Sequence, residues 1–430
     1  MKHQFIGFLG VVCAFLLATL PSFAQPLQPE DALTPEAAEP DPITVSLLTC
    51  SPSDKEVYTL FGHTAIRLQD RRTGDDWAFN YGVFNFNKPF FALRFLFGIT
   101  DYELGVIPYE LFVREYQRMG RGIVEQRIQM TAEEKWAIRE ALARNYNTDR
   151  IYRYNFLTNN CTTKARDMID RCIGGSINYR QQRPASLSYR EMVRECTKGH
   201  PWITFTNDIC LGLTADQPTD IGQQQFLPNH LMQDFDKATV TREGQTSASR
   251  LVEETIHVLS PQKESTPNGF TPTPTHLFGL LLVISLIIAA IERKRQQVWR
   301  VWDALLFTPL AICGILMLAL FCSQHPTTST NLQILLVSPL IVFYLPSIYR
   351  NKTSRFWKIE TILLVLFLFG SCFQDYAEGT LFLAQSLLTR CYIHRKAIIG
   401  HHQDGKNGDK SPQGRTIEET KETERQQKDS

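Results

Sequence analysis

The 430-residue sequence has almost no net charge, because 45 lysine and arginine residues stand against 44 aspartate and glutamate residues, for a formal charge of +1. A globally basic surface for nucleic acid is therefore excluded, and so is an acidic chain that stays solvated without a core. Hydrophobic residues make up 43% of the sequence and aromatic residues 11%, which is enough to build a large core.

The sequence also lacks an internal repeat and any usual zinc spacing. Cys196, His200, Cys210 and His230 come nearest to a metal-binding set, but their separations do not match the short paired spacings of zinc sites. We therefore expect no metal ion and no other cofactor.

The N-terminus has the form of a secretory signal. Lys2 and His3 precede an uncharged run from Phe5 to Leu20, and the small residues around Ala24 fit cleavage by a signal peptidase. We expect a signal peptide over residues 1–24; the alternative, an uncleaved signal anchor, would export the same downstream region. Because prolines and acidic residues follow, we expect a solvated linker over residues 25–42. A second linker is expected over residues 241–276.

The C-terminal third holds apolar runs that suit membrane helices. Leu277–Ile291, Ala304–Cys322 and Leu332–Tyr349 are uncharged, against about 20 apolar residues needed for a spanning helix. Two weaker runs follow at residues 361–373 and 381–393, and the alternative for these short runs is a re-entrant element. We expect about five transmembrane helices over residues 277–398 and a charged tail over residues 399–430.

Lysine and arginine residues in successive loops indicate the orientation, because cytoplasmic loops hold an excess of them. The loops near residues 323–331 and 375–379 carry none, and we count Arg390, Arg395 and Lys396 toward the cytoplasmic end. The pattern predicts a multi-pass protein with an exported N-terminal domain. The two positive loops contain Arg293, Lys294, Arg295 and Arg300, and then Arg350, Lys352, Arg355 and Lys358.

The exported part is predicted to be a mixed α+β domain over residues 43–240. It contains an odd number of cysteines, so at least one is unpaired or pairs between molecules. The expected elements are a hairpin over residues 64–81, a strand over 123–128, a helix opened by the capping box at 131–134, and a helix from about Cys161 to Ile173 capped by Asn160.

Cys161 is the candidate nucleophile, because it falls in the first turn of an expected helix. Free N–H groups and the positive end of the helix dipole favour the thiolate there. The alternative is a structural cysteine, buried or paired with Cys172, Cys196 or Cys210. Backbone N–H groups around Cys161, with Asn160 and Thr162 beside it, are the candidate oxyanion and positioning groups.

A cysteine nucleophile needs a base and a group that orients the base. His63 begins one hairpin strand, and Asn80 on the returning strand could lie beside it. The alternative for a lone histidine is a satisfied core or surface group, and the register of a hairpin is not fixed by its sequence.

Phenylalanines are concentrated between Phe84 and Phe97. Their helical spacing is explained if they belong to a helix that packs in the core. The functional interpretation is an acyl groove or an interfacial surface, with Phe90 and Phe91 as the candidate groove residues.

A histidine on an early hairpin followed by a cysteine at a helix start reverses the order found in papain. This order resembles the circularly permuted papain-like group that includes lecithin:retinol acyltransferase. The chain is moreover similar to the Lnb family of bacterial lipoprotein N-acyltransferases over about residues 44–231 and in the C-terminal helix cluster. The strings that carry this likeness are LTCSP (48–52), FGH (61–63), FNYGVF (79–84), EQ (125–126), YNF (154–156), NCTT (160–163), RD (166–167), PW (201–202) and FLP (226–228).

The resemblance implies a circularly permuted papain-like periplasmic domain followed by an all-α transmembrane bundle in the inner membrane. It implies a thiol acyltransferase that moves an acyl chain from a membrane phospholipid, through a thioester, to the α-amino group of the diacylglyceryl cysteine of lipoproteins. Cys161 and His63 match the nucleophile and the base of the family. Asn80 matches less closely, because permuted relatives often place a second histidine there.

Two other functions fit the same residues. A membrane-tethered periplasmic cysteine hydrolase, acting on cell wall or protein, would use the same cysteine and histidine with water. A non-catalytic membrane receptor or assembly subunit would need Cys161 only as a structural residue. Rapid alkylation of Cys161 near neutral pH would separate an enzyme from a receptor.

Overall fold

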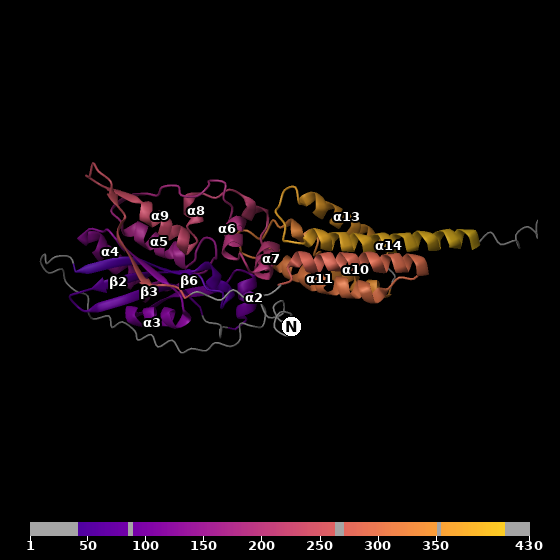
Figure 1. Cartoon of the computed structure of the whole chain (residues 1–430), viewed down its shortest axis with the longest axis horizontal. Coiled ribbons are helices and arrows are strands. Elements are labelled where there is room, and N and C mark those ends of the chain that lie inside the picture. Colours follow the sequence, from indigo (N-terminus) through magenta and orange to yellow (C-terminus); the bar gives the residue numbers. More distant parts are fainter. Residues whose placement is uncertain (1–41, 85–88, 263–270, 351–353, 409–430) are drawn as a thin grey trace, which may run out of the picture. The chain divides into compact units, whose positions relative to one another are not determined.

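The computed structural model describes residues 42–84, 89–262, 271–350 and 354–408, which form two compact units (Figure 1). The first unit contains the described residues up to 262 together with Ala319–Thr330, and the second contains Thr271–Leu318 and the residues from Asn331 onward. The expected signal peptide, nearly all of the linker over 25–42 and most of the tail lie outside the described residues.

An antiparallel sheet forms the centre of the first unit, in the strand order β10-β5-β1-β2-β3-β4-β6. Its register is fixed at β1, where Cys50 lies opposite His63 of β2 and Ile123 of β5. The strands are β1 (Ile43–Cys50), β2 (His63–Asp70), β3 (Asp75–Val83), β4 (Asp101–Pro108), β5 (Ile123–Ile128), β6 (Ile151–Arg153) and β10 (Val252–Leu259).

Helices cover both faces of this sheet, as Figure 1 shows. On one face α4 (Ala132–Thr148), α5 (Cys161–Cys172) and α9 (Pro228–Lys237) share a core with alternate residues of β1. On the other face Phe112 and Tyr116 of α3 (Tyr109–Met119) pack against Leu48 and Cys50 of β1. This burial on both faces explains why β1 is apolar along most of its length.

Smaller elements complete the first unit. They include the three-stranded sheet of β7 (Gly175–Asn178), β8 (Thr239–Arg242) and β9 (Ser249–Arg250), the helices α2 (Phe91–Leu96), α6 (Tyr189–Cys196), α7 (Pro201–Cys210) and α8 (Ile221–Gln224), and the 3-10 turns η2 (Val57–Phe61) and η3 (Leu213–Asp216).

The predicted hairpin, the strand over 123–128 and the two capped helices are confirmed. The side chain of Thr131 accepts the Glu134 N–H at the start of α4, and Asn160 caps α5. The mixed α/β class of the first unit and the helical class of the second are confirmed as well.

Strand β10 differs from the expectation that residues 241–276 form a linker. It pairs with β5 at the edge of the sheet, so the first unit continues to Leu259. Glu253 to Thr255 are three consecutive exposed polar residues, so the first half of this edge strand lacks the apolar alternation that would predict it.

The second unit consists of helices. Three segments are long and apolar enough to cross a membrane, Pro274–Arg295, Arg300–Phe321 and Leu332–Arg350. The other two expected crossings fall on α13 and α14, and they stay a prediction. The elements are α10 (Pro274–Arg295), α11 (Arg300–Phe321, whose last turn belongs to the first unit), η4 (Leu332–Leu335), α12 (Leu340–Arg350), α13 (Ser354–Gly370) and α14 (Thr380–Gly408).

A buried ionic cluster joins three of these helices. Arg390 of α14 contacts Glu292 of α10 at 2.5 Å and Asp303 of α11 at 2.7 Å, and all three side chains are almost fully buried. His394 lies one turn further along α14, with its Nε2 2.8 Å from Asp303. We counted Arg390 as a cytoplasmic charge from the sequence, but the two carboxylates surround it inside the helical unit.

Candidate active site

The hairpin of β2 and β3 brings His63 and Asn80 together, as predicted. His63 is the first residue of β2, and Asn80 lies on β3 three residues before its end. The imidazole Nε2 of His63 is hydrogen-bonded to Oδ1 of Asn80. Because an amide oxygen only accepts, Nε2 must carry the proton, which leaves Nδ1 as the basic nitrogen.

Cys161 is the first residue of α5, and Asn160 fixes its position. The Asn160 Oδ1 accepts the N–H groups of Thr162 and Thr163, each at 2.9 Å. Its amide group donates to the carbonyls of Phe156 and Phe226, at 2.8 and 2.9 Å. All polar atoms of this buried side chain are therefore used to hold the helix start.

These bonds leave one backbone donor at the nucleophile. Within the described residues, no acceptor binds the N–H of Cys161, whereas the next two N–H groups of α5 are taken by Asn160. A free N–H at the nucleophile is the arrangement that can stabilise an oxyanion.

His63 shifts the pKa of Cys161. Burial raises the pKa of the thiol. The charge and hydrogen bond of His63, together with the Thr64 N–H and the Thr162 hydroxyl, lower this pKa by more than burial raises it, to about 7. Thr162 Oγ1 lies 3.8 Å from the sulfur and is held by Thr64 at 3.1 Å. The site therefore favours a thiolate close to neutral pH.

The pKa of His63 moves in the opposite direction. Burial lowers it, but the neighbouring thiolate and the hydrogen bonds to Cys161 and Asn80 raise it above its ordinary value. By contrast, burial raises the pKa of Cys50, which lies opposite His63 in the sheet, to about 12. The pairing with an imidazolium therefore distinguishes Cys161 from a neighbouring buried cysteine.

Two glycines let these elements approach one another. Gly62 has φ +79°, and a Cβ there would lie 2.9 Å from the Cys50 carbonyl oxygen. Gly82 has φ +93° and lies beside Cys161, where the pairing of β3 with β4 shifts register between Asn80 and Val83. A larger residue at either position would strain the backbone next to the site.

The comparisons with known proteins match both units. Residues 31–195 match the Lnb N-terminal periplasmic domain, and residues 264–401 match the Lnb transmembrane domain. The chain belongs to the Lnb family. It is therefore a membrane protein of the Lnb lipoprotein maturation family, with a periplasmic domain. Neither a curated protein nor a solved structure matches the chain.

A series of aromatic rings runs beside Cys161 in the Lnb periplasmic domain, and sequence analysis did not identify all of its members. Burial and the charge of Cys161 raise the pKa of Tyr154, and its ring stacks on Tyr102 with 4.0 Å between the ring centroids. The ring of Tyr102 in turn contacts that of Phe84, and Phe84 stacks on Phe91, with 5.1 and 6.1 Å between the ring centroids. The string YNF at 154–156 was the only sequence signal for Tyr154.

The two phenylalanines expected to line an acyl groove lie in different environments. Phe91 is buried among these rings, whereas Phe90 is 76% exposed. Phe90 has a left-handed backbone conformation, with φ 56°, immediately before α2. The sequence places the two residues side by side and does not separate the buried ring from the exposed one.

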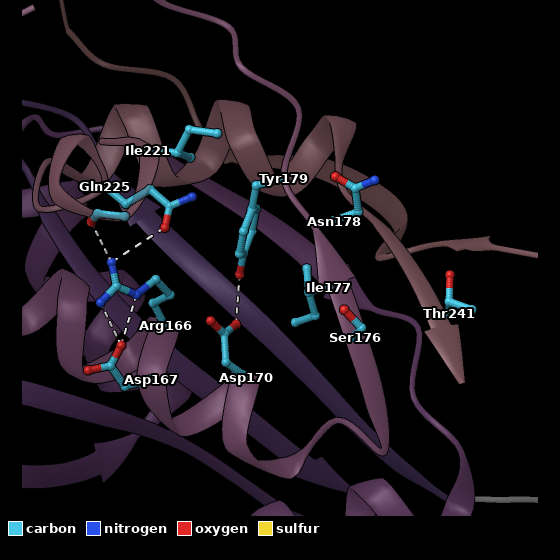
Figure 2. Close-up of a pocket in the computed structure, with 11 residues that line it drawn as sticks. Arg166, Asp167, Asp170, Ser176, Ile177, Asn178, Tyr179, Ile221, Gln225 and Thr241 are labelled. Carbon is cyan, nitrogen blue, oxygen red and sulfur yellow. Dashed lines mark hydrogen bonds and ion pairs between the residues drawn. The ribbon is translucent and has the colours of Figure 1, made fainter. Parts of the chain in front are cut away.

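A polar pocket of about 720 Å³ lies elsewhere in the Lnb periplasmic domain, at the far end of α5 (Figure 2). Tyr179 points toward Asp170 and donates to it at 2.7 Å, and burial raises the pKa of this carboxyl to about 6. Arg166 donates to the Gly222 carbonyl at 2.6 Å and pairs with Asp167. Asp170 is nine residues from Cys161 along α5, or about 13 Å, so this pocket is separate from the candidate active site.

Proposed function

We propose that this Lnb chain is a lipoprotein N-acyltransferase in which Cys161 carries the acyl chain between two substrates. The observation that supports this most is the convergence of Cys161, His63 and Asn80 at a helix start, in a periplasmic domain that continues into a membrane domain. We further propose that the membrane is the inner membrane and that the protein crosses it several times.

The first half-reaction takes an acyl chain from a membrane phospholipid. The Cys161 thiolate attacks the ester carbonyl carbon, and the C–S bond forms as the carbonyl electrons move to oxygen. The free N–H of Cys161 is positioned to donate to this oxyanion, with Asn160 and Thr162 holding the helix start. When the C–O bond breaks, His63 protonates the departing alkoxide, and a lysophospholipid leaves.

The second half-reaction gives the acyl chain to the lipoprotein. The α-amine of the diacylglyceryl cysteine attacks the thioester carbonyl, and neutral His63 accepts the proton that the amine loses. Collapse of the intermediate breaks the C–S bond and restores the Cys161 thiolate beside the imidazolium. No external energy is needed, because a thioester lies above an amide in free energy.

The aromatic rings near Cys161 are the proposed contact for the acyl chain. Moving a chain out of the bilayer requires an apolar surface, since burial of each CH₂ is worth about 0.8 kcal/mol. The ring series from Tyr154 through Tyr102 and Phe84 to Phe91 offers such a surface beside the nucleophile. We propose that Phe91 lies along this path and that Phe90 belongs to its lipid-facing end.

The proposal is tested on the lipoproteins themselves. Lipoprotein N-termini are compared by mass spectrometry in cells that lack the gene, carry it, or carry Cys161→Ala. We expect one additional amide-linked acyl chain only with the unaltered gene. An identical set of N-termini in all three strains would reject acyl transfer. Cleavage of muropeptides or peptides that depends on Cys161 would favour the cysteine hydrolase instead.

A further inference from the structure

The short helix α2 exposes a group of apolar side chains that the core of the periplasmic domain does not cover. The exposed fractions are 76% for Phe90, 54% for Leu93, 45% for Phe95 and 36% for Phe97. We call these four residues the α2 surface. Clustered exposure of large apolar side chains marks a surface that contacts something other than water.

The C-terminal end of α2 is bound to a segment that is distant in the sequence but belongs to the same unit. The Gln324 N–H donates to the Phe97 carbonyl at 2.9 Å, and Nε2 of His325 lies 3.0 Å from the Phe95 carbonyl oxygen. Arg153 of β6 also donates to the Gln324 side chain, at 3.3 Å. The α2 surface and residues 324–325 are therefore held together.

The other end of the same segment is bound to the periplasmic domain as well. The Gly212 N–H donates to the Thr327 carbonyl at 2.6 Å, and the Leu213 N–H donates to the Thr330 carbonyl at 3.0 Å. The segment is thus fixed at both ends, by α2 and by the start of η3, and its contact with α2 does not depend on one bond.

Chain continuity places this segment at a bilayer surface. Phe321 ends one segment that is long and apolar enough to cross a membrane, and Leu332 begins the next. The connection between them must leave the bilayer and return to it. Gln324 is three residues from Phe321. Even a fully extended chain covers only about 11 Å over three residues, so Gln324 lies within about 11 Å of the end of the membrane segment.

We infer that the α2 surface docks onto the phospholipid bilayer. Apolar helix faces at membrane interfaces lie about 5–10 Å into the headgroup boundary. Arg94, the one cation within α2, pairs with Asp101 at 2.8 Å. Asp101 also pairs with Arg153, at 2.8 Å. Since this carboxylate holds both cations, we expect docking to depend on apolar contact rather than on attraction to anionic headgroups.

This docking has a consequence for the proposed function. Phe91, on the buried side of α2, begins the ring series that leads to Cys161. A lipid at the α2 surface would lie at the outer end of that series, where an acyl chain would enter.

The test is photo-crosslinking in the full chain, in membranes whose lipids carry a radiolabel. Phe90→p-benzoylphenylalanine and Leu93→p-benzoylphenylalanine place the probe on the α2 surface. Leu111→p-benzoylphenylalanine is the matched control, because Leu111 is 51% exposed but lies on α3. Phe343, which is 78% exposed within the membrane segment Leu332–Arg350, gives the positive control.

We expect lipid adducts at positions 90 and 93 to exceed those at position 111 several-fold and to be independent of the anionic lipid content. The same adducts should form in a Cys161→Ala background, so the result does not depend on the proposed chemistry. Yields at 90 and 93 equal to that at 111, or adducts to protein instead of lipid, would overturn the inference.

Discussion

His63 and Asn80 form a hydrogen bond in which the imidazole Nε2 donates to an amide oxygen. This bond fixes the tautomer of His63 and leaves Nδ1 as the nitrogen that can accept the proton of the Cys161 thiol. A neutral amide orients the ring without adding a negative charge that would hold the proton on the imidazolium. The base can therefore release its proton in the first half-reaction and accept a proton from the amine in the second.

The first prediction separates the base from the group that orients it. His63→Ala should lower the rate of acyl-enzyme formation by on the order of 10² or more, because no group remains to activate the thiol. Asn80→Ala should lower it less, and Asn80→His should restore most of the rate, since a histidine can also accept from Nε2. A single-turnover assay with labelled phospholipid measures these rates. Full activity in His63→Ala would mean that another residue is the base.

The second prediction concerns the pH dependence of the thiol. The alkylation rate of Cys161 should rise as pH passes through about 7, because the thiolate is the reactive form. His63→Ala should move this inflection to higher pH, since burial would still raise the pKa but the imidazolium would no longer lower it. Peptide mass spectrometry after brief iodoacetamide treatment measures the modification at each pH. An inflection that stays in place in His63→Ala would contradict the ion pair.

The third prediction distinguishes Phe90 from Phe91. Phe91→Asp should lower thermal stability, because it places a carboxylate among the rings of Phe84 and Phe95. Phe90→Asp should leave folding intact and lower acyl-enzyme formation from phospholipid more than the reaction of Cys161 with a small soluble thiol reagent. Equal losses in the two assays for Phe90→Asp would show that Phe90 has no role toward lipid.

The fourth prediction concerns the buried ionic cluster of the membrane domain. Arg390→Met should destabilise this domain by about 3–5 kcal/mol, because Glu292 and Asp303 would remain buried without their partner. Arg395→Met, on an exposed position of the same helix, should change stability by less than about 0.5 kcal/mol. Unfolding in mild detergent measures both. Adding Glu292→Gln and Asp303→Asn to Arg390→Met should recover part of the loss, and equal stability of the two single variants would contradict the role of the cluster.

Local signals in the sequence were enough to predict the start of α5. Asn160 followed by Thr163 forms a reciprocal cap, and such a cap depends on neighbouring residues alone. The hairpin was also predictable from its alternation, which allowed His63 and Asn80 to be proposed as partners. Their hydrogen bond required the register of β2 and β3, and that register is set by the whole sheet.

Features that depend on distant parts of the chain were not predicted. The first half of strand β10 is polar, and the strand is held in place by β5, more than a hundred residues earlier in the sequence. Arg390 looked like a loop charge, and only the folded helices bring Glu292 and Asp303 to it. The connection between two membrane segments gave no sign in the sequence that it binds α2.

Whether Cys161 carries the acyl chain can be seen on the protein itself. The full chain is reconstituted with phospholipid, without a lipoprotein acceptor, and the peptide that contains Cys161 is analysed by mass spectrometry. We expect an added acyl mass on Cys161 that hydroxylamine removes, that is absent from Cys161→Ala, and that disappears when a diacylated lipopeptide is supplied. An unmodified Cys161 in protein that still acylates the lipopeptide would contradict the thioester mechanism.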